Sequence, residues 1–341
     1  MKKFEINADL CHEYLVTQTR QQLAFNPDKD LEEQRVAVRE KLTELMGIDR
    51  IALNACAENF FIESEEIKDG YKQIRFIFES EKNNFVPCYL LIPTTGKEKY
   101  PVAITLQGHA KGGMANSIGV EVPEEPNYQP RGAYAIQAVQ NGFAALCIEL
   151  RGMWGELQPK NPVKLRGECC QYTAFSALVL GRTLIGERCW DVFRAIDLLP
   201  KFSGLDTDNI VITGSSGGGT MSYYAACLDE RIKFSVPSCA FCSLEQSILN
   251  CWHCPCNYIP NMYNYFDMQD LAVLISPRRL TIVNGAEDTA FTIDGAKKAF
   301  ETVKAIYEKA GVPDNCKLIV TPNGHYWRDD IVWESINEMF K

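Results

Sequence analysis

Residues 209–220 read NIVITGSSGGGT. The β-branched run Ile210–Thr213 predicts a buried strand, and the five residues after it fit G-x-S-x-G in one frame only, with Ser216 as the serine. The frame that would select Ser215 needs glycine at Thr213, so Ser216 is the candidate nucleophile and Ser215 is not. Small neighbours are required because a serine on a tight strand-to-helix turn has strained backbone angles. A phosphate-binding or purely structural glycine turn is the alternative, but the stretch lacks a P-loop lysine and a G-x-G-x-x-G order; we therefore predict a nucleophile elbow.

The composition indicates a globular protein that binds a small molecule. The chain has 341 residues, of which 46% are hydrophobic and 23% charged, and this suits one large α/β core. A formal charge of −9 without basic clusters argues against nucleic acid and against an anionic membrane as partners. Met1-Lys2-Lys3 runs directly into polar residues, so we expect no signal peptide. Fourteen cysteines without an export signal favour a reducing compartment, and we predict a cytoplasmic protein.

The order of elements predicts an α/β fold with a mostly parallel central sheet, helices on both faces and an N-terminal helical and hairpin extension. An amphipathic helix is expected over Asp30–Gly47, followed by a hairpin of Tyr71–Phe78 and Val86–Ile92. Apolar runs predict further strands at Val102–Leu106, Ala144–Leu150, Ile210–Thr213, Phe234–Cys239, Leu280–Asn284 and Leu318–Thr321. We divide the chain into an extension over residues 1–70, packed on the core, and a catalytic domain over residues 71–341. An irregular insertion at about residues 240–271 should leave the sheet at the carboxyl ends of the strands, where ligands bind.

A nucleophilic serine needs a histidine base and a carboxylate that orients it. Of the four histidines, His325 follows the last predicted strand, whereas His12 lies far from any strand end. The loop after the strand Leu280–Asn284 offers Glu287 and Asp288, and spacing alone does not separate them. The chain order of serine, carboxylate and histidine is that of α/β hydrolases.

Three further stretches add a family resemblance. Residues 181–191 (GRTLIGERCWD), 206–214 (DTDNIVITG) and 275–280 (ISPRRL) resemble the dienelactone hydrolase and acetyl xylan esterase-like branch of the α/β hydrolases, over roughly residues 76–341. The resemblance implies an α/β-hydrolase fold. It also implies that the last position of a G-x-x-D pattern is the acid, which favours Asp288 over Glu287.

The loop after the first parallel strand departs from that pattern. Many α/β hydrolases carry His-Gly there, whereas this chain reads Gln107-Gly108-His109. By position, the backbone amides of His109 and Gly217 should form the oxyanion hole, since an amide donor does not depend on the side chain. We expect the His109 side chain to be a loop residue near the pocket and not a second base.

The cysteines form two C-x-x-C pairs, Cys239 with Cys242 and Cys251 with Cys254, and Cys256 lies just beyond. Four thiolates at such spacing could hold zinc. The first pair begins inside a predicted core strand, however, and the intervening stretch is short. We expect no metal and no cofactor, although the residues leave metal binding by this cluster open.

Aromatic and polar side chains on the strand-end loops are candidate substrate contacts. They are Trp154, Trp327 and, within the insertion, His253, Asn257 and Tyr258.

These features together predict a serine hydrolase that cleaves carboxylic esters through an acyl-enzyme. Short acyl groups such as acetyl, on a polar or carbohydrate alcohol, are the expected small-molecule substrates. A peptidase or amidase of the same fold is the first alternative, and a non-catalytic binding protein is the second. The sequence leaves open whether the chain forms a homo-oligomer.

Overall fold

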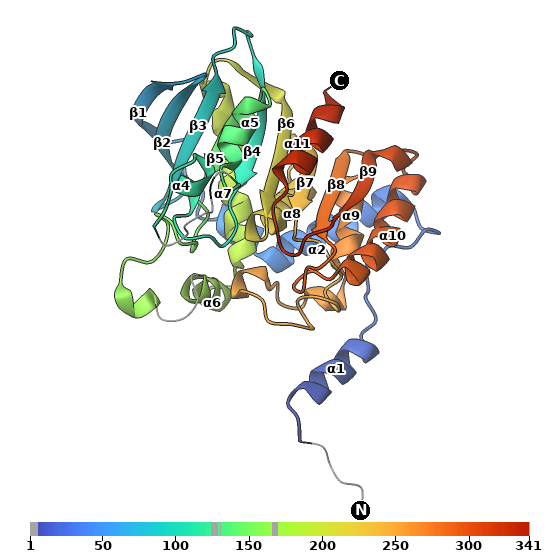
Figure 1. Ribbon diagram of the computed structural model, residues 1–341. Coiled ribbons are helices and arrows are strands. Elements are labelled where there is room, and N and C mark those ends of the chain that lie inside the picture. The colour runs from blue at the N-terminus through green and yellow to red at the C-terminus, as the bar shows by residue number, and fades with distance from the viewer. Residues whose placement is uncertain (1–5, 124–128, 130, 166–169, 341) are drawn as a thin grey trace, which may run out of the picture.

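The computed structural model describes residues 6–123, 129, 131–165 and 170–340, and this part of the chain contains a nine-stranded sheet (Figure 1). The strand order is β1-β2-β3-β5-β4-β6-β7-β8-β9. The strands are β1 Phe60–Lys68, β2 Tyr71–Glu81, β3 Asn84–Pro93, β4 Tyr100–Leu106, β5 Ala144–Ile148, β6 Leu205–Ser215, β7 Ile232–Ser238, β8 Arg279–Gly285 and β9 Cys316–Thr321.

The sheet is antiparallel at one end and parallel over the rest. Strands β1, β2, β3 and β5 pair antiparallel, whereas β5, β4, β6, β7, β8 and β9 pair parallel. Leu106 at the end of β4 lies opposite Gly214 at the end of β6, and Gly214 lies opposite Pro237 of β7. The carboxyl ends of the parallel strands therefore meet at one edge, which is where an α/β sheet binds its ligands.

Helices cover both faces of the sheet, as the sequence predicts (Figure 1). Alternate residues of one strand supply the two cores: Ile212 belongs to the core beneath α2, α7, α8 and α10, and Val211 to the core beneath α5 and α11. The α-helices are α1 Asp9–Gln18, α2 Leu31–Met46, α3 Ile48–Ala52, α4 Met114–Ser117, α5 Tyr134–Gln140, α6 Gln171–Val179, α7 Leu184–Leu198, α8 Gly217–Leu228, α9 Ala272–Ile275, α10 Ile293–Lys309 and α11 Asp329–Met339. Short 3₁₀ turns are η1 Pro162–Leu165, η2 Leu199–Lys201, η3 Pro255–Asn257, η4 Met262–Asn264, η5 Met268–Leu271 and η6 Pro313–Asn315.

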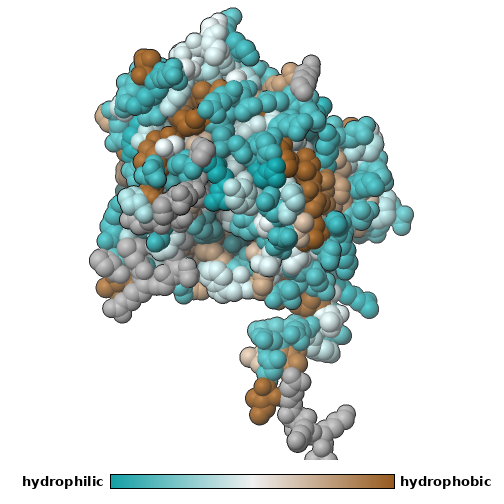
Figure 2. Space-filling model, in the orientation of Figure 1, coloured by the Kyte–Doolittle hydropathy of each residue, from teal (hydrophilic) through white to brown (hydrophobic). Residues whose placement is uncertain are grey.

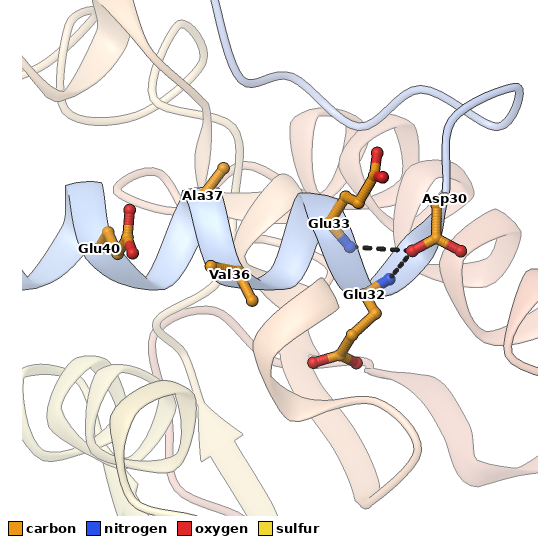
Figure 3. Close-up of a pocket in the computed structure, with 6 residues that line it drawn as sticks. All are labelled: Asp30, Glu32, Glu33, Val36, Ala37 and Glu40. Carbon is orange, nitrogen blue, oxygen red and sulfur yellow. Dashed lines mark hydrogen bonds between the residues drawn. The ribbon is translucent and has the colours of Figure 1, made fainter.

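Helix α2 begins and ends where its capping residues stand. The Asp30 carboxylate accepts the backbone N–H groups of Glu32 and Glu33, each at 2.9 Å (Figure 3), and Gly47 ends the helix in the left-handed conformation. Val38 and Leu42 are buried in the same core as the central sheet. The N-terminal segment thus contributes directly to the core on which it packs.

Helix α1 stands apart from the body in Figures 1 and 2 and buries none of its residues. The chain joins the body further on, where the amides of Gln22 and Leu23 donate to the carbonyls of Asn264 and Tyr265. None of the helices in the described part of the chain combines the length and apolar character that crossing a bilayer requires.

Candidate active site

The turn between β6 and α8 carries Ser216 at φ 56° and ψ −121°, a conformation that side-chain-bearing residues rarely adopt. The turn is held on both sides, because the Ser216 N–H donates to the carbonyl of Ser238 at 2.9 Å and the Ser216 carbonyl accepts from Thr220 N–H at 2.8 Å. Ser216 precedes the first residue of α8, so the free N–H groups of that helix lie next to it. This is the strained strand-to-helix turn that the sequence predicts.

At three glycines around the serine, a backbone carbonyl oxygen is the atom closest to where a Cβ would stand. A Cβ on Gly214 would lie 2.4 Å from the carbonyl oxygen of Leu106, and one on Gly218 would lie 2.1 Å from the same oxygen. A Cβ on Gly219 would lie 2.5 Å from the carbonyl oxygen of Ser238. The last residues of β4 and β7 therefore lie directly against the turn, and only glycine leaves them room.

His325 and Asp288 come together from the loops after β9 and β8. The Asp288 Oδ2 and the His325 Nδ1 are 2.8 Å apart, and the Asp288 side chain is fully buried whereas that of His325 is 37% exposed. Glu287 is exposed, and its side chain is not the one that bonds the histidine. Spacing left these two acids unresolved; the folded chain pairs His325 with Asp288.

The environment of Asp288 favours its charged form. Burial raises the pKa of this carboxyl, but the hydrogen bond and charge of His325 and two backbone amides outweigh burial and place the pKa below its ordinary value. Those amides, of Ala290 and Phe291, donate to Oδ1 at 2.9 and 3.0 Å, which leaves Oδ2 directed at the histidine. The Phe291 ring stacks on the His325 ring at 6.1 Å. With Nδ1 engaged, the Nε2 atom of His325 is the one available to accept a proton.

A hollow of about 370 Å³ opens over the turn and contains both Ser216 and His325. Its walls are His109, Trp154, Gly217, Trp252, His253, Cys254, Asn257, Ala290 and Phe291. Three of the five predicted substrate contacts, Trp154, His253 and Asn257, are among them. A second hollow, of about 300 Å³, is also lined by Ser216 and His325 and includes Arg131 and Trp327.

Two of the predicted contacts lie differently from the expectation. Trp327 is only 2% exposed and packs on Tyr134 with its indole N–H donating to Gln137, so it is mainly a core residue at the edge of the second hollow. Tyr258 lines neither hollow; its hydroxyl donates to the carbonyl of Ile248. Trp252, by contrast, lines the first hollow and is 70% exposed. Phe291 also lines this hollow, and it was not predicted because no sequence motif marks it.

The loop after β4 lies against the serine turn, as an oxyanion-hole loop must. A Cβ on Gly108 would lie 3.3 Å from the Cβ of Ser216, and a Cβ on Gly217 would lie 3.0 Å from the His109 Nδ1. In the described part of the chain, the His109 N–H donates to no backbone carbonyl, and the Gly217 N–H opens α8 without an intrahelical acceptor. Both amides are thus free to bind a negatively charged oxygen.

The two C-x-x-C pairs do not converge on one point. The Cys242 thiol lies against Thr292, and the Cys251 thiol lies 3.4 Å from the His253 Nε2. Cys254 and Cys256 instead group with His109 and with Cys170, which no spacing pattern had connected to them. Cys239 groups with the two residues of the acid–base pair.

The sheet order and the serine-bearing turn define an α/β hydrolase. The chain belongs to the Abhydrolase family (Abhydrolase_7), whose profile matches residues 6–332. The protein named "Putative hydrolase YtaP" of Bacillus subtilis (strain 168) is 24% identical over 245 residues, which are 70% of this chain and 78% of that protein.

Two solved structures share the architecture. A putative acetyl xylan esterase from Bacteroides fragilis NCTC 9343 has a TM-score of 0.80 at 16% identity, over 98% of this chain and 96% of that chain. A glucuronoyl esterase from Solibacter usitatus has a TM-score of 0.64 at 14% identity, over 93% of this chain and 95% of that chain. At such identities the likeness is one of fold, and the expected α/β-hydrolase fold is confirmed. The dienelactone hydrolase part of the resemblance stays a prediction.

Proposed function

We propose that this protein hydrolyses carboxylic esters through an acyl-enzyme on Ser216. One observation carries the proposal: Ser216 stands on a strained turn in the same hollow as His325, whose Nδ1 is held by a buried carboxylate. A scaffold that only bound a ligand would have no physical need for this combination. Family membership indicates a hydrolase, and the proposal adds the bond that is cleaved, a carboxylic ester, and the nucleophile, Ser216.

In the proposed reaction His325 Nε2 takes the proton of the Ser216 hydroxyl as its oxygen attacks the ester carbonyl. The carbonyl oxygen becomes an oxyanion, which the free amides of His109 and Gly217 stabilise. Asp288 stabilises the imidazolium and keeps it oriented. The intermediate then expels the alcohol, which takes the proton from His325. In the second half, His325 takes a proton from a water molecule as that water attacks the acyl-serine, and Ser216 leaves with the proton from His325.

The shape and lining of the hollow support a short acyl group and a polar alcohol. A volume of about 370 Å³ with Trp154, Trp252 and Asn257 in its wall suits a ring-shaped polar group stacked on an aromatic side chain. The name of the acetyl xylan esterase supports an acetylated carbohydrate, whereas the name of the glucuronoyl esterase supports a carbohydrate ester only in general, because its sugar is the acyl part. We propose acetyl esters of a carbohydrate or similar alcohol as the substrates.

A cytoplasmic location belongs to the same proposal. None of the thirteen cysteines within the described ranges forms a disulfide, which supports a reducing compartment.

The test combines active-site labelling with a panel of substrates. A fluorophosphonate probe should label Ser216, and Ser216→Ala should abolish both labelling and turnover while Ser215→Ala keeps both. The panel should contain p-nitrophenyl esters of rising chain length, acetylated sugars and aminoacyl amides. Preferential cleavage of acetylated sugars supports the proposal, and preferential cleavage of the amides would assign the alternative peptidase function. Labelling at Ser215, or an active Ser216→Ala variant, would refute it.

A further inference from the structure

The side chains of His109, Cys170, Cys254 and Cys256 form a cluster beside the active-site hollow. One ligand atom from each lies within 4.8 Å of all the others, and His109 Nε2 lies 3.2 Å from the Cys256 Sγ. We infer that these four residues bind a zinc ion. The inference departs from the sequence-based expectation of no metal, and it does not depend on the proposed esterase activity.

The donor atoms and their spacing fit zinc. Three thiolates and one imidazole are a common donor set for tetrahedral structural zinc. Zinc–sulfur bonds of about 2.3 Å and zinc–nitrogen bonds of about 2.0 Å place tetrahedral ligand atoms about 3.5–3.8 Å apart. The separation of 3.2 Å between His109 Nε2 and Cys256 Sγ is slightly below that value and no separation exceeds 4.8 Å, so adjustments of about an ångström complete the geometry.

The three cysteines of the cluster are buried, whereas His109 is half-buried and, with Cys254, lines the active-site hollow. Cys170 is fully buried, Cys256 is 2% exposed and Cys254 is 8% exposed. Four protein ligands leave no position for water or substrate, so the proposed ion is structural and takes no part in catalysis.

A buried positive charge next to the cluster gives an independent argument. Arg188 is among the largest fully buried side chains, and no carboxylate pairs with it in the described part of the chain. Its guanidinium donates to the Cys170 Sγ at 3.1 Å and to the backbone carbonyl of Arg151 at 2.6 and 2.9 Å. If the thiols were neutral, every printed hydrogen-bond partner of this buried guanidinium would be uncharged, which is costly. A divalent zinc ion with three thiolates and a neutral imidazole carries one net negative charge, and this balances Arg188.

A disulfide explains the cluster less well than a metal. A disulfide between two of the three sulfurs, at about 2.05 Å, is neutral and could not balance the charge of Arg188. It would also not include the third sulfur or the imidazole. Zinc uses all four donors.

The ion would join three segments that lie far apart in the chain. His109 belongs to the loop after β4, Cys170 directly precedes α6, and Cys254 and Cys256 belong to the insertion that walls the hollow. Coordination through Nε2 would also keep the proton of His109 on Nδ1, the nitrogen that faces Gly217. His109 would then be unable to act as a base.

Metal analysis of the full-length chain tests the inference. The protein is purified without a histidine tag and without chelators, and we expect about one zinc ion per chain by mass spectrometry. Cys170→Ser and Cys256→Ser should lower the zinc content to well below one, whereas the matched controls Cys242→Ser and Cys251→Ser should keep it. Ser216→Ala should lose labelling but keep its zinc, so failure of the zinc site and failure of the esterase proposal are distinguishable.

Cobalt exchange of the wild-type chain keeps the test independent of whether the variants fold. Cobalt bound at the cluster should give the intense visible bands and the thiolate charge-transfer absorption of a tetrahedral cobalt–sulfur site. The three thiols should react with a disulfide reagent only after the metal is removed. A wild-type protein that contains no zinc, takes up neither zinc nor cobalt and has freely reactive thiols would overturn the inference. Equal loss of zinc in Cys251→Ser and Cys256→Ser would overturn the assignment of the ligands.

Discussion

The replacement of Glu149 by glutamine tests whether this buried carboxyl stabilises the loop after β4, to which it is hydrogen-bonded. Glu149 is 1% exposed; its Oε1 accepts the Gln107 amide at 3.1 Å and its Oε2 accepts the Met114 backbone N–H at 3.2 Å. Burial raises the pKa of this carboxyl from 4.5 to about 7, the charge of Glu156 acts in the same direction, and the hydrogen bonds oppose both. The loop that carries the His109 amide therefore rests on a carboxyl whose charge changes near neutral pH.

The magnitude follows from the two pKa values. Because the pKa in the folded chain lies above the unfolded value, the folded protein holds more protons between pH 4.5 and about 7. Stability must therefore fall as the pH rises through that range. A difference of about 2.5 pH units at about 1.4 kcal/mol per unit amounts to about 3.5 kcal/mol, of which the interval from about pH 4 to about pH 8 captures about 3 kcal/mol. Glu149→Gln removes this ionisation and loses one acceptor, which costs about 1–3 kcal/mol at every pH.

The assay is urea unfolding of the wild type and Glu149→Gln at about pH 4 and about pH 8. The free energy of unfolding of the variant relative to the wild type should rise by about 3 kcal/mol from the lower to the higher pH. Glu287→Gln, at an exposed carboxylate, is the matched control for the substitution itself. If the difference between Glu149→Gln and the wild type were the same at both pH values, the reasoning about this buried carboxyl would be wrong.

Three further substitutions test the site and its support. Asp288→Asn should lower turnover by about 10⁴-fold, because the imidazole loses its orienting carboxylate, whereas Glu287→Gln should change it little; steady-state kinetics decide, and the reverse ranking would contradict the pairing. Arg151→Met should destabilise the fold by about 3–5 kcal/mol, because the buried Asp191 loses the guanidinium bonded to it at 2.6 Å and Glu81 keeps only Arg182; an unchanged melting temperature would argue against this network. Trp252→Ala should change the ratio of rates between acetylated sugars and p-nitrophenyl acetate while probe labelling of Ser216 persists, and unchanged ratios would remove this side chain from the substrate contacts.

The serine turn was predictable because its constraints are local. A β-branched strand, a small-residue turn and the start of a helix follow one another within residues 209–220, so the pattern states the structure directly. The parallel strands were predictable for a similar reason, since burial on both faces leaves continuous apolar runs. The helices α5 and α6 gave no comparable signal, because they are short and lack a clearly polar face.

The parts that escaped prediction depend on contacts between distant segments. Spacing alone did not separate Glu287 from Asp288, and the choice of Asp288 came from the family resemblance; in the fold, the amides of Ala290 and Phe291 hold one oxygen of Asp288 and leave the other for His325. Cys170 lies beside Cys254, Cys256 and His109 only because three separate segments of the chain come together in the fold. Spacing within one segment cannot predict such a contact. Tyr258 was placed in the pocket from composition alone, and composition does not say which way a loop side chain points.

The glycines of the serine turn have a consequence for how such a protein can diverge. Gly214, Gly218 and Gly219 each have a backbone carbonyl within 2.5 Å of where a Cβ would stand. A side chain in the way can be exchanged for a smaller one by a second mutation, but a main-chain carbonyl cannot, so these positions admit no compensated replacement. The exposed Trp252 has no such restriction. Substitutions are therefore tolerated more readily among exposed residues that line the hollow than at these glycines. Related proteins can change their substrates in this way while the turn that carries Ser216 keeps its structure.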